Sequence, residues 1–386
     1  MVETARTRIL IVDDSAVMRS LVRSVICTDV SLEVAGTASD GESALRLIET
    51  LHPDLVLLDV EMPVMDGLMT LKQMRARHLS PPVIMCSALT QRGARVTIEA
   101  LASGAADYVA KPSNQVGPAM AIQTLANDLI PKIHALTSRI PFVPSSPGNA
   151  HVPGNFIASL RPLLPFAQPP HMPQPITAQP TIVVIGVSTG GPAALDVLLP
   201  ALPANFPLPV LIVQHMPELF TRLLAERLHE RCPLNVREAA VGDLVAPGTI
   251  YIARGNWHME VIAQRGARAI PSSTLNLTQA PPENHCRPAV DVLFRTAASV
   301  YGAGVLAVVL TGMGSDGLVG ARMVRANGGS VLAQDEPTSA VWGMPGAVTQ
   351  AGVANRVLPL KAIAPEILRL IRRTQREAIE LRGSGV

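Results

Sequence analysis

The strongest constraint on the fold is a regular alternation of short apolar runs with longer amphipathic segments in the first third of the chain. The apolar runs, which are typical of buried strands, cover residues 9–14, 32–38, 53–59, 81–88 and 106–112. The helical patterns that follow them cover residues 15–27, 41–51, 67–77, 91–103 and 114–137. Strict alternation of strand and helix predicts one α/β domain, built on a parallel sheet with helices on both faces.

A proline-rich stretch at 138–180 interrupts this alternation. It holds eleven prolines and its few apolar residues have no period, which predicts a semi-extended linker. Strand-like runs then return at 181–188, 209–216, 249–255, 258–263, 304–312 and 330–335. Helical patterns lie at 192–200, 217–231, 289–301 and 317–327, with a charged amphipathic helix at 360–382. We therefore predict a second, doubly wound α/β domain with some antiparallel strands.

Charge and cysteine content exclude several classes of protein. The 386 residues include 32 basic and 30 acidic side chains, so no strongly basic face is expected and nucleic acid is not an expected partner. The four cysteines are far apart and form no C-x-x-C pair, which argues against a disulfide framework or a zinc site. No apolar stretch approaches the ~20 residues that span a bilayer. We expect a cytoplasmic protein without membrane insertion.

Polar side chains follow the predicted strands of the first domain where these strands end. They are Asp13 and Asp14 after the first strand, Asp59 after the third, Ser87 after the fourth and Lys111 after the fifth. Ligands of open parallel sheets bind in the crevice at these strand ends. Because three converging carboxylates repel one another unless a cation neutralises them, this oxygen-rich edge suits Mg²⁺.

Such a group of residues is typical of phosphoryl transfer. A carboxylate can attack a phosphoryl group and become an aspartyl phosphate, while Mg²⁺ and Lys111 offset charge on the phosphoryl oxygens. Ser87 would hydrogen-bond one of these oxygens. Taken singly, a strand-end aspartate is usually a helix N-cap or turn former, and a lysine before proline is usually just solvated. Five such residues at the ends of four strands favour the phosphorylation site.

The segments ILIVDDS, LLDVEMPVMDG, MCSAL and DYVAKP resemble the signature segments of the response-regulator receiver domain, over about residues 8–130. The resemblance implies a flavodoxin-like fold with a five-stranded parallel sheet, and Asp59 as the phosphoacceptor. It implies Asp14 and Asp59 as Mg²⁺ ligands, with Asp13 in support and the backbone carbonyl of Glu61 as the remaining protein ligand. It assigns three residues to the switch: Ser87, Lys111 and Tyr108.

In the second domain the first strand ends in IGVSTGGP. Ser188 lies where this strand turns into a helix, Gly190 and Gly191 allow a tight turn, and Pro192 suits the first helical position. A hydroxyl beside backbone N–H groups at a helix N-terminus is a setting for an acyl-transfer nucleophile with its oxyanion hole. Without partners, such a turn is more often a phosphate cradle or a plain cap.

A serine nucleophile needs a base and an acid that orients it. His215 follows the buried run PVLIVQ, and Asp316 lies in LTGMGSDG after the run GVLAVVL. The strand ends of one parallel sheet can bring the three residues together, in a chain order that differs from that of the α/β-hydrolases. Taken alone, His215 fits a strand-end histidine without chemistry and Asp316 fits a helix N-cap. Periodicity leaves open whether they meet.

The segments IGVSTGGP, VQHMP, YIARGNWHMEV, RPAVDVLF, LTGMGSDG and AVWGMPGAV resemble the catalytic domain of the chemotaxis protein-glutamate methylesterases, over about residues 181–370. The resemblance implies Ser188 as the nucleophile, His215 as the general base and Asp316 as the residue that orients it. Thr189 and the backbone around Met313 would line the site and help to hold the oxyanion. This half of the chain would need no cofactor.

The chain departs from this family at one position beside the site. The family commonly shows Asn-x-His-Arg-Pro before the VDVLF segment, whereas here the residues are Asn284, His285, Cys286, Arg287 and Pro288. A cysteine therefore stands where the family usually has histidine. The departure affects the role of that side chain and leaves the expected triad unchanged.

Together the two resemblances imply a receiver domain at 1–137, a linker at 138–180 and a methylesterase catalytic domain at 181–386. They imply hydrolysis of glutamate methyl esters, and deamidation of glutamines, on methyl-accepting chemotaxis receptors. Phosphorylation by the chemotaxis histidine kinase would weaken an inhibitory contact of the receiver with the esterase site. We expect the protein to be a monomer.

Three alternatives remain at this point. One is a non-enzymatic regulator, in which the receiver is joined to a binding module. Another is a DNA-binding response regulator, which would need a helix-turn-helix after the linker, where buried strands and glycine-rich turns stand instead. The third is the same esterase in a non-flagellar chemosensory pathway, and the sequence does not separate it from flagellar chemotaxis.

Overall fold

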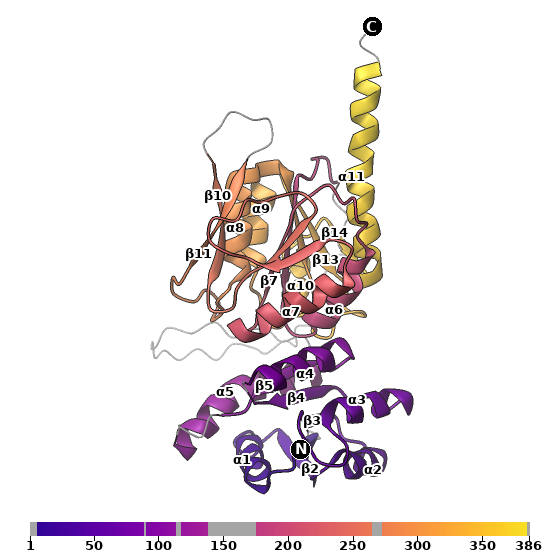
Figure 1. Ribbon diagram of the computed structural model, residues 1–386, viewed down its shortest axis with the longest axis vertical. Helices are drawn as coiled ribbons and strands as arrows, with labels where there is room; N and C mark the ends of the chain where they lie inside the picture. Colours follow the sequence, from indigo (N-terminus) through magenta and orange to yellow (C-terminus); the bar gives the residue numbers. More distant parts are fainter. Residues whose placement is uncertain (1–5, 89, 113–116, 138–174, 265–271, 384–386) are drawn as a thin grey trace, which may run out of the picture.

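The computed structural model describes residues 6–88, 90–112, 117–137, 175–264 and 272–383. In Figure 1 these residues form two α/β units along the long axis, with the N-terminal unit at the bottom. The expected linker at 138–180 lies outside the described residues up to position 174. We call residues 6–137 the first unit and residues 175–383 the second unit.

The first unit is a five-stranded parallel sheet covered by helices on both faces, as predicted. Its strands, in the spatial order β2-β1-β3-β4-β5, are β1 (Thr7–Val12), β2 (Leu32–Ala38), β3 (Leu55–Asp59), β4 (Val83–Ser87) and β5 (Asp107–Ala110). Its helices are α1 (Ala16–Ile26), α2 (Gly41–Leu51), α3 (Gly67–Ala76), α4 (Gln91–Ala102) and α5 (Pro118–Thr137). Helices α1 and α5 pack together, and α3 packs between α2 and α4. This is the flavodoxin-like arrangement.

Side-chain caps begin the first four helices. Ser15, Asp40, Asp66 and Thr90 each accept a hydrogen bond from the backbone N–H three residues further on. Because Ser15 caps α1, the preceding aspartates are not used as its N-cap. The alternative reading as helix N-caps is therefore wrong for Asp13 and Asp14, whereas the reading as a turn former holds for Asp13, whose Oδ1 accepts the backbone N–H of Ser15 at 2.9 Å.

The second unit is built on a seven-stranded parallel sheet. Its strands, in the spatial order β14-β13-β12-β6-β7-β9-β8, are β6 (Ile182–Val187), β7 (Val210–Gln214), β8 (Asn235–Glu238), β9 (Thr249–Ile252), β12 (Val305–Val309), β13 (Ser330–Gln334) and β14 (Arg356–Leu358). Antiparallel pairing is confined, within the described strands, to a separate hairpin of β10 (His258–Ala263) and β11 (Ser273–Thr278). The prediction of a parallel sheet with some antiparallel strands is confirmed.

Helices cover both faces of this larger sheet. They are α6 (Gly191–Leu198), α7 (Glu218–Arg231), α8 (Val290–Tyr301), α9 (Leu318–Ala326), α10 (Met344–Gln350) and α11 (Leu360–Gly383), with short 3₁₀ turns η1 (Leu199–Ala201) and η2 (Gly302–Gly304). Helix α11 rises along one side of the unit and projects beyond it in Figure 1. No helix among the described residues has the length and apolar character needed to cross a membrane.

The sequence pattern did not predict four elements: β8, β11, β14 and α10. Strands β8 and β14 form the two edges of the seven-stranded sheet and have three or four residues each. Short, polar edge strands are a common defence against edge-to-edge pairing, and they lack the continuous apolar run of a buried strand. In β8 only Val236 is buried. Such strands form because the sheet beside them is already in place.

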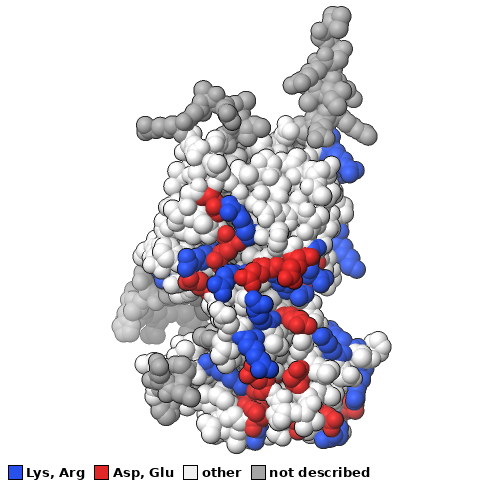
Figure 2. Space-filling view, in the orientation of Figure 1, with Lys and Arg blue, Asp and Glu red and all other residues white. Residues whose placement is uncertain are grey.

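The two units meet through α4 and β5 on one side and α6 and α7 on the other. The ring of Tyr108 stacks on that of Phe220, with centroids 4.4 Å apart. An ion pair of 3.5 Å joins Arg95 to Glu226 across the same junction. Figure 2 shows acidic and basic side chains intermixed around the narrow waist where the units meet. The interface thus has a stacked, buried centre and a charged rim.

Gly186 in β6 tests how tightly α8 packs on the central strand. A Cβ at this position would lie 2.3 Å from Cγ1 of buried Val290, so Gly186→Ala must push the first turn of α8 away from the sheet. We expect the unfolding free energy to fall by about 1–3 kcal/mol. In contrast, Gly117→Ala has no neighbour within 4 Å and should change it by less than about 0.5 kcal/mol. Calorimetric unfolding of both variants measures the difference, and equal stabilities would contradict this packing.

Candidate functional sites

The carboxyl edge of the first sheet gathers three acidic side chains. Asp13, Asp14 and Asp59 each place a carboxylate oxygen within 4.8 Å of the others. Lys111, which follows β5, lies between two of them, with Nζ 2.8 Å from Asp13 Oδ2 and 2.7 Å from Asp59 Oδ1. Since β3 is flanked by β1 and β4, its last residue lies at the middle of this edge. The group is partly open to solvent, because Asp14 is exposed.

Burial governs the charge state of this pocket. Burial raises the pKa of Asp59 to about 6, although the ion pair with Lys111 acts in the opposite direction. Burial alone would lower the pKa of Lys111, but its hydrogen bonds to Asp13 and Asp59 raise it instead. The second carboxylate oxygen of Asp59, Oδ2, is buried and has no hydrogen-bond partner. A buried carboxylate oxygen without a partner, beside two further carboxylates, fits a small divalent cation such as Mg²⁺.

The remaining predicted residues of the first unit lie around this pocket or face away from it. Ser87 is fully buried and its hydroxyl donates to the carbonyl of Ala88 at 3.2 Å. The backbone N–H of Glu61 donates to Asp59 Oδ1 at 3.4 Å, while its exposed side chain pairs with Arg92. Tyr108 instead packs against the second unit. The structure thus places this residue at the interface of the two units.

The central strands of the second sheet position the other candidate residues. Ser188 directly follows β6 and His215 directly follows β7, while Asp316 lies in the loop after β12. Because β12, β6 and β7 are adjacent and parallel, their carboxyl ends lie at the same edge. His215 Nε2 and Asp316 Oδ2 are 2.8 Å apart. Ser188, His215 and Met313 line one cavity of 1690 Å³, which also reaches Tyr108 of the first unit.

Asp316 is a buried carboxylate with an almost complete set of donors. Besides His215, it accepts the backbone N–H groups of Val290 at 2.7 Å and Asp291 at 3.0 Å, and the side-chain amide of Asn284 at 3.0 Å. Burial alone would raise the pKa of Asp316, but the hydrogen bond and charge of His215 lower it. Gly317, not Asp316, is the N-cap of α9. The carboxylate therefore binds the first turn of α8.

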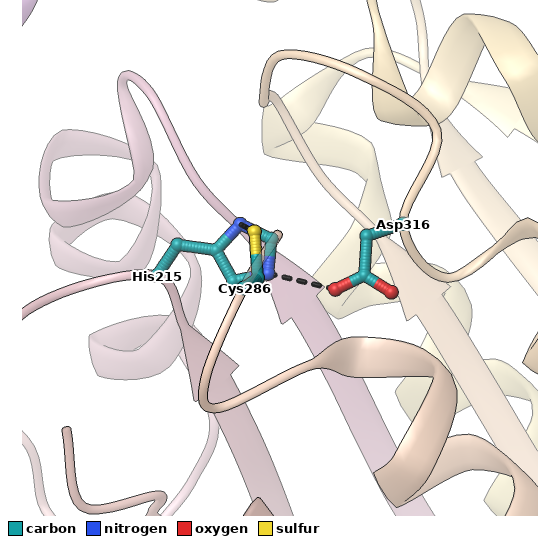
Figure 3. A group of neighbouring side chains, drawn as sticks. All are labelled: His215, Cys286 and Asp316. Carbon is teal, nitrogen blue, oxygen red and sulfur yellow. Dashed lines mark hydrogen bonds and ion pairs between the residues drawn. The ribbon is translucent and has the colours of Figure 1, made fainter. Parts of the chain in front are cut away.

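His215 has a partner on each ring nitrogen. Figure 3 shows Asp316 beside one edge of the ring and the sulfur of Cys286 close to the other nitrogen. The distance from Nδ1 to Cys286 Sγ is 3.6 Å. Burial alone would lower the pKa of His215, yet the hydrogen bonds with Asp316 and Cys286 raise it to about 10. Because Asp316 occupies Nε2, Nδ1 is the nitrogen left to accept a proton.

Ser188 is close to this histidine but not bonded to it. Among the hydrogen bonds of the described residues, none joins Ser188 Oγ to His215. Catalytic hydrogen bonds are often long or poorly aligned without substrate and tighten when it binds. The carbonyl of Ser188 is held by the side chain of Gln214 at 2.9 Å and by the N–H of Gly191 at 2.8 Å. These contacts keep the strand-to-helix turn in place.

The first unit covers the polar groups next to Ser188. The hydroxyl of Thr189 donates to Asp107 Oδ2 at 2.6 Å, and the N–H of Gly190 donates to the carbonyl of Ala106 at 3.0 Å. Both acceptors belong to the segment that begins β5. Donors at the N-terminus of α6, where a negative charge would be stabilised, are thus partly engaged by the first unit.

The group around His215 is less suited to a metal ion than the three aspartates of the first unit. Donor atoms of His215, Cys286 and Asp316 lie within 4.8 Å of one another. However, a metal ion between the imidazole and the carboxylate would need bonds of about 2.0–2.2 Å to each, and the direct hydrogen bond of 2.8 Å leaves no room for it. The arrangement suits acid–base chemistry.

Several contacts were not predicted from the sequence. They involve Asp107, Phe220, Gln214, Asn284 and Asp291. Gln214 stands directly before His215, and Asp291 is the third residue of the helical pattern predicted at 289–301, so position along the chain was a usable signal for these two. The partners Asp107 and Phe220 meet residues of the other unit, and no local pattern reports such a contact.

Comparisons with known proteins agree with both units. The model of the response regulator receiver domain matches residues 9–118, and that of the CheB methylesterase matches residues 183–367. A protein of Nocardioides sp. named protein-glutamate methylesterase/protein-glutamine glutaminase is 48% identical over 95% of this chain and 96% of its own length. A protein of the same name from Trichodesmium erythraeum is 46% identical over 94% and 99%, respectively.

Among solved structures, the crystal structure of the Thermotoga maritima CheB methylesterase catalytic domain is 45% identical. It covers 50% of this chain and 98% of its own, with a TM-score of 0.48. The two full-length relatives share both units with this chain in one polypeptide. The chain therefore belongs to the family of protein-glutamate methylesterases/protein-glutamine glutaminases, in which a response-regulator receiver precedes a CheB methylesterase domain.

Proposed function

We propose that this protein is a receiver-controlled serine esterase that hydrolyses glutamate methyl esters, and deamidates glutamines, on methyl-accepting chemotaxis receptors. The observation that carries the proposal is the position of Ser188, His215 and Asp316 at neighbouring strand ends, with the imidazole held on the carboxylate at 2.8 Å. A nucleophile, a base and an orienting acid on one edge are the parts that acyl transfer requires.

The reaction uses Nδ1 of His215, the ring nitrogen that Asp316 does not bind. Ser188 Oγ attacks the γ-carbonyl carbon of the ester while His215 Nδ1 takes the serine proton. The imidazolium then gives this proton to the leaving group, which departs as methanol from an ester and as ammonia from a glutamine. Water, deprotonated by the same nitrogen, releases the glutamate. Asp316 keeps the ring oriented and stabilises its positive charge throughout.

Negative charge on the substrate oxygen would be stabilised by backbone amides at the turn. Ser188 lies at the start of α6, whose N-terminus offers N–H groups and a positive dipole end. Thr189 and the backbone around Met313 border the same cavity. Removal of one such donor typically costs about 10²–10³ in rate. A contact that occupies these donors would therefore inhibit the esterase.

We propose Asp59 as the phosphoacceptor of the receiver, with the chemotaxis histidine kinase as donor. Asp13, Asp14, Asp59 and the Glu61 carbonyl would hold Mg²⁺, which when bound supplies positive charge to the phosphoryl oxygens. Lys111 contributes its own charge from a position between two carboxylates. Ser87 is buried at the next strand end, where its hydroxyl can turn toward a phosphoryl group.

Control of the esterase would act through β5. Its Asp107 binds the hydroxyl of Thr189 and its Tyr108 stacks on Phe220, while Lys111 follows the same strand into the acidic pocket. A phosphoryl group on Asp59 would move Lys111 from its present contact with the carboxylate and draw Ser87 toward the phosphoryl oxygens, and these shifts would strain the contacts with the second unit. The closed arrangement is the resting state, and phosphorylation weakens it.

The first prediction concerns the nucleophile. Ser188→Ala removes the attacking oxygen, so release of methanol from methylated receptor membranes should fall by at least about 10³-fold. Ser315→Ala is the matched control, because this serine lines the same cavity without a predicted role, and it should retain most of the activity. Methanol is measured with and without Mg²⁺ and a small-molecule phosphodonor. Undiminished release by Ser188→Ala would exclude this serine as the nucleophile.

The second prediction concerns the interface. Asp107→Ala removes the carboxylate that holds Thr189, so esterase activity without phosphodonor should rise several-fold and the further stimulation by phosphodonor should shrink. Asp128→Ala is the control, since Asp128 also pairs with Lys132, at 2.8 Å, but contacts no residue of the second unit through a described hydrogen bond. Methanol release is again the measurement. If both variants match the wild type without phosphodonor, Asp107 does not restrain the esterase.

The third prediction concerns the charge of Asp59. Its pKa in the folded protein, about 6, lies above the ordinary value of 3.8, so the folded chain binds more protons between these pH values and loses stability as the pH rises through them. Asp59→Asn should therefore stabilise the first unit by roughly 1–3 kcal/mol at pH 7, and this gain should vanish below about pH 4. Thermal unfolding at both pH values measures it.

Mg²⁺ provides the control for this stability effect. Millimolar Mg²⁺ should stabilise the wild type and narrow the gap to Asp59→Asn, whereas KCl at the same ionic strength should not. An Asp59→Asn variant that is less stable than the wild type at pH 7 without Mg²⁺ would contradict the assignment of Asp59 as a buried carboxylate with a raised pKa.

A further inference from the structure

Cys286 is held beside His215 by a well-defined turn. It closes a tight turn in which Glu283 and Cys286 exchange both backbone hydrogen bonds, at 3.1 and 2.8 Å. The two central residues, Asn284 and His285, have φ values of 51° and 63°, as a type I′ turn requires. Neither is glycine, so this backbone conformation costs free energy that surrounding contacts must offset.

Those contacts come from the acid side of the same site. The amide of Asn284 donates to Asp316 Oδ1 at 3.0 Å and to Asp291 Oδ2 at 2.9 Å. The turn is thereby tied to the carboxylate that orients His215. It holds Cys286 Sγ 3.6 Å from His215 Nδ1, on the wall of the cavity and partly accessible to solvent. Figure 3 shows the thiol, the imidazole and the carboxylate as one chain of contacts.

We propose that Cys286 is a second nucleophile of this site: a modification site for soft electrophiles, and for hydrogen peroxide in particular, through which oxidation switches the esterase off. A thiol beside an imidazole that is oriented by a carboxylate is the arrangement in which sulfur gives its proton to nitrogen and reacts as the thiolate. The inhibitory part of this inference rests on the proposed function, in which His215 is the base for Ser188.

The oxidation is balanced with the groups present and one peroxide molecule. The proton of the thiol moves to His215 Nδ1. The thiolate then attacks one oxygen of the peroxide, so that an S–O bond forms and the O–O bond breaks. The departing hydroxide takes the proton from the imidazolium and leaves as water. Sulfur is oxidised to a sulfenic acid, peroxide is reduced to water, and a thiol reductant reverses the change.

Oxidation would inhibit the esterase because Ser188 and Cys286 use the same proton acceptor. Nε2 is bonded to Asp316, so Ser188 and Cys286 both depend on Nδ1. A sulfenic acid at Cys286 adds an oxygen next to Nδ1 and a hydroxyl that hydrogen-bonds to it. Ser188 then loses its proton acceptor, and the cavity wall at this position becomes bulkier and more polar.

The chain contains a matched control thiol. Cys232 is partly exposed like Cys286, but burial, together with the charge of Asp196, raises its pKa to about 11. Cys27 is exposed and provides a reference for a freely accessible thiol. All are present in the same molecule, so each measurement carries its own standards.

The test is timed alkylation of the full-length native protein with iodoacetamide at pH 7, followed by mass spectrometry of each cysteine. Cys286 should react about tenfold faster than Cys232, and faster than Cys27. In His215→Ala and Asp316→Asn the rate at Cys286 should fall to that of Cys232 or below, while the rate at Cys27 stays the same. A rate at Cys286 no higher than at Cys232, or one that both variants leave unchanged, would overturn the proposal.

Peroxide tests the switch on the same protein. Dimedone should label Cys286 after peroxide treatment, and methanol release should fall at least fivefold and return after dithiothreitol. In Cys286→Ala the fractional loss on peroxide treatment should stay below twofold, whatever its starting activity. Labelling needs no esterase activity, so labelling without any methanol release refutes the proposed function alone. Full activity of a protein whose Cys286 is labelled by dimedone refutes the switch alone.

Discussion

The second unit depends on how one buried negative charge is satisfied. Asp316 is removed from water, and a buried carboxylate is stable only with donors around it. Its donors come from three parts of the chain: the ring of His215 after β7, the first turn of α8, and the turn that contains Asn284. The same four hydrogen bonds that stabilise the charge therefore fix the distance between the base and the elements around it, and the backbone N–H of the neighbouring Gly317 adds a fifth. Losing this carboxylate would release all three at once.

One short strand, β5, links the receiver to the esterase. Strand β5 has four residues, and it serves two surfaces. Asp107 and Tyr108 at its beginning contact Thr189 and Phe220 of the other unit, whereas Lys111 just after its end pairs with Asp59. Lys132 of α5 supports the beginning of the strand, because it donates to the carbonyl of Tyr108 at 2.7 Å. A change in charge at Asp59 can thus reach the interface through one ion pair with Lys111 and the short stretch of chain from Lys111 back to Tyr108.

The sequence was informative where local pattern determines position, and silent where it does not. Alternating apolar runs predicted both parallel sheets, and strand ends predicted that Ser188 and His215 would share an edge. Asp316 was expected either in a triad or as a cap of the helix after it; in the structure it binds α8, which precedes it by some 25 residues in sequence. The stacking of Tyr108 on Phe220 depends on how two folded units meet. The resemblance pointed to Cys286 as unusual, but only the turn geometry places its sulfur on Nδ1 of the base.

The position of the Cys286 sulfur at Nδ1 of His215 agrees with the resting state of the proposed mechanism. The hydrogen bonds with Asp316 and Cys286 raise the pKa of His215, and the Cys286 sulfur lies against Nδ1, so this nitrogen is not free for the proton of Ser188. The first unit acts separately, because it binds Thr189 and Gly190 beside the nucleophile. Departure of the receiver would open the cavity to substrate. Binding of an ester would then bring the hydroxyl of Ser188 to Nδ1 of His215, which Cys286 contacts in the closed arrangement. In the proposed mechanism, activation is therefore a change of hydrogen-bond donor at Nδ1 of His215 that follows a change of contact at β5.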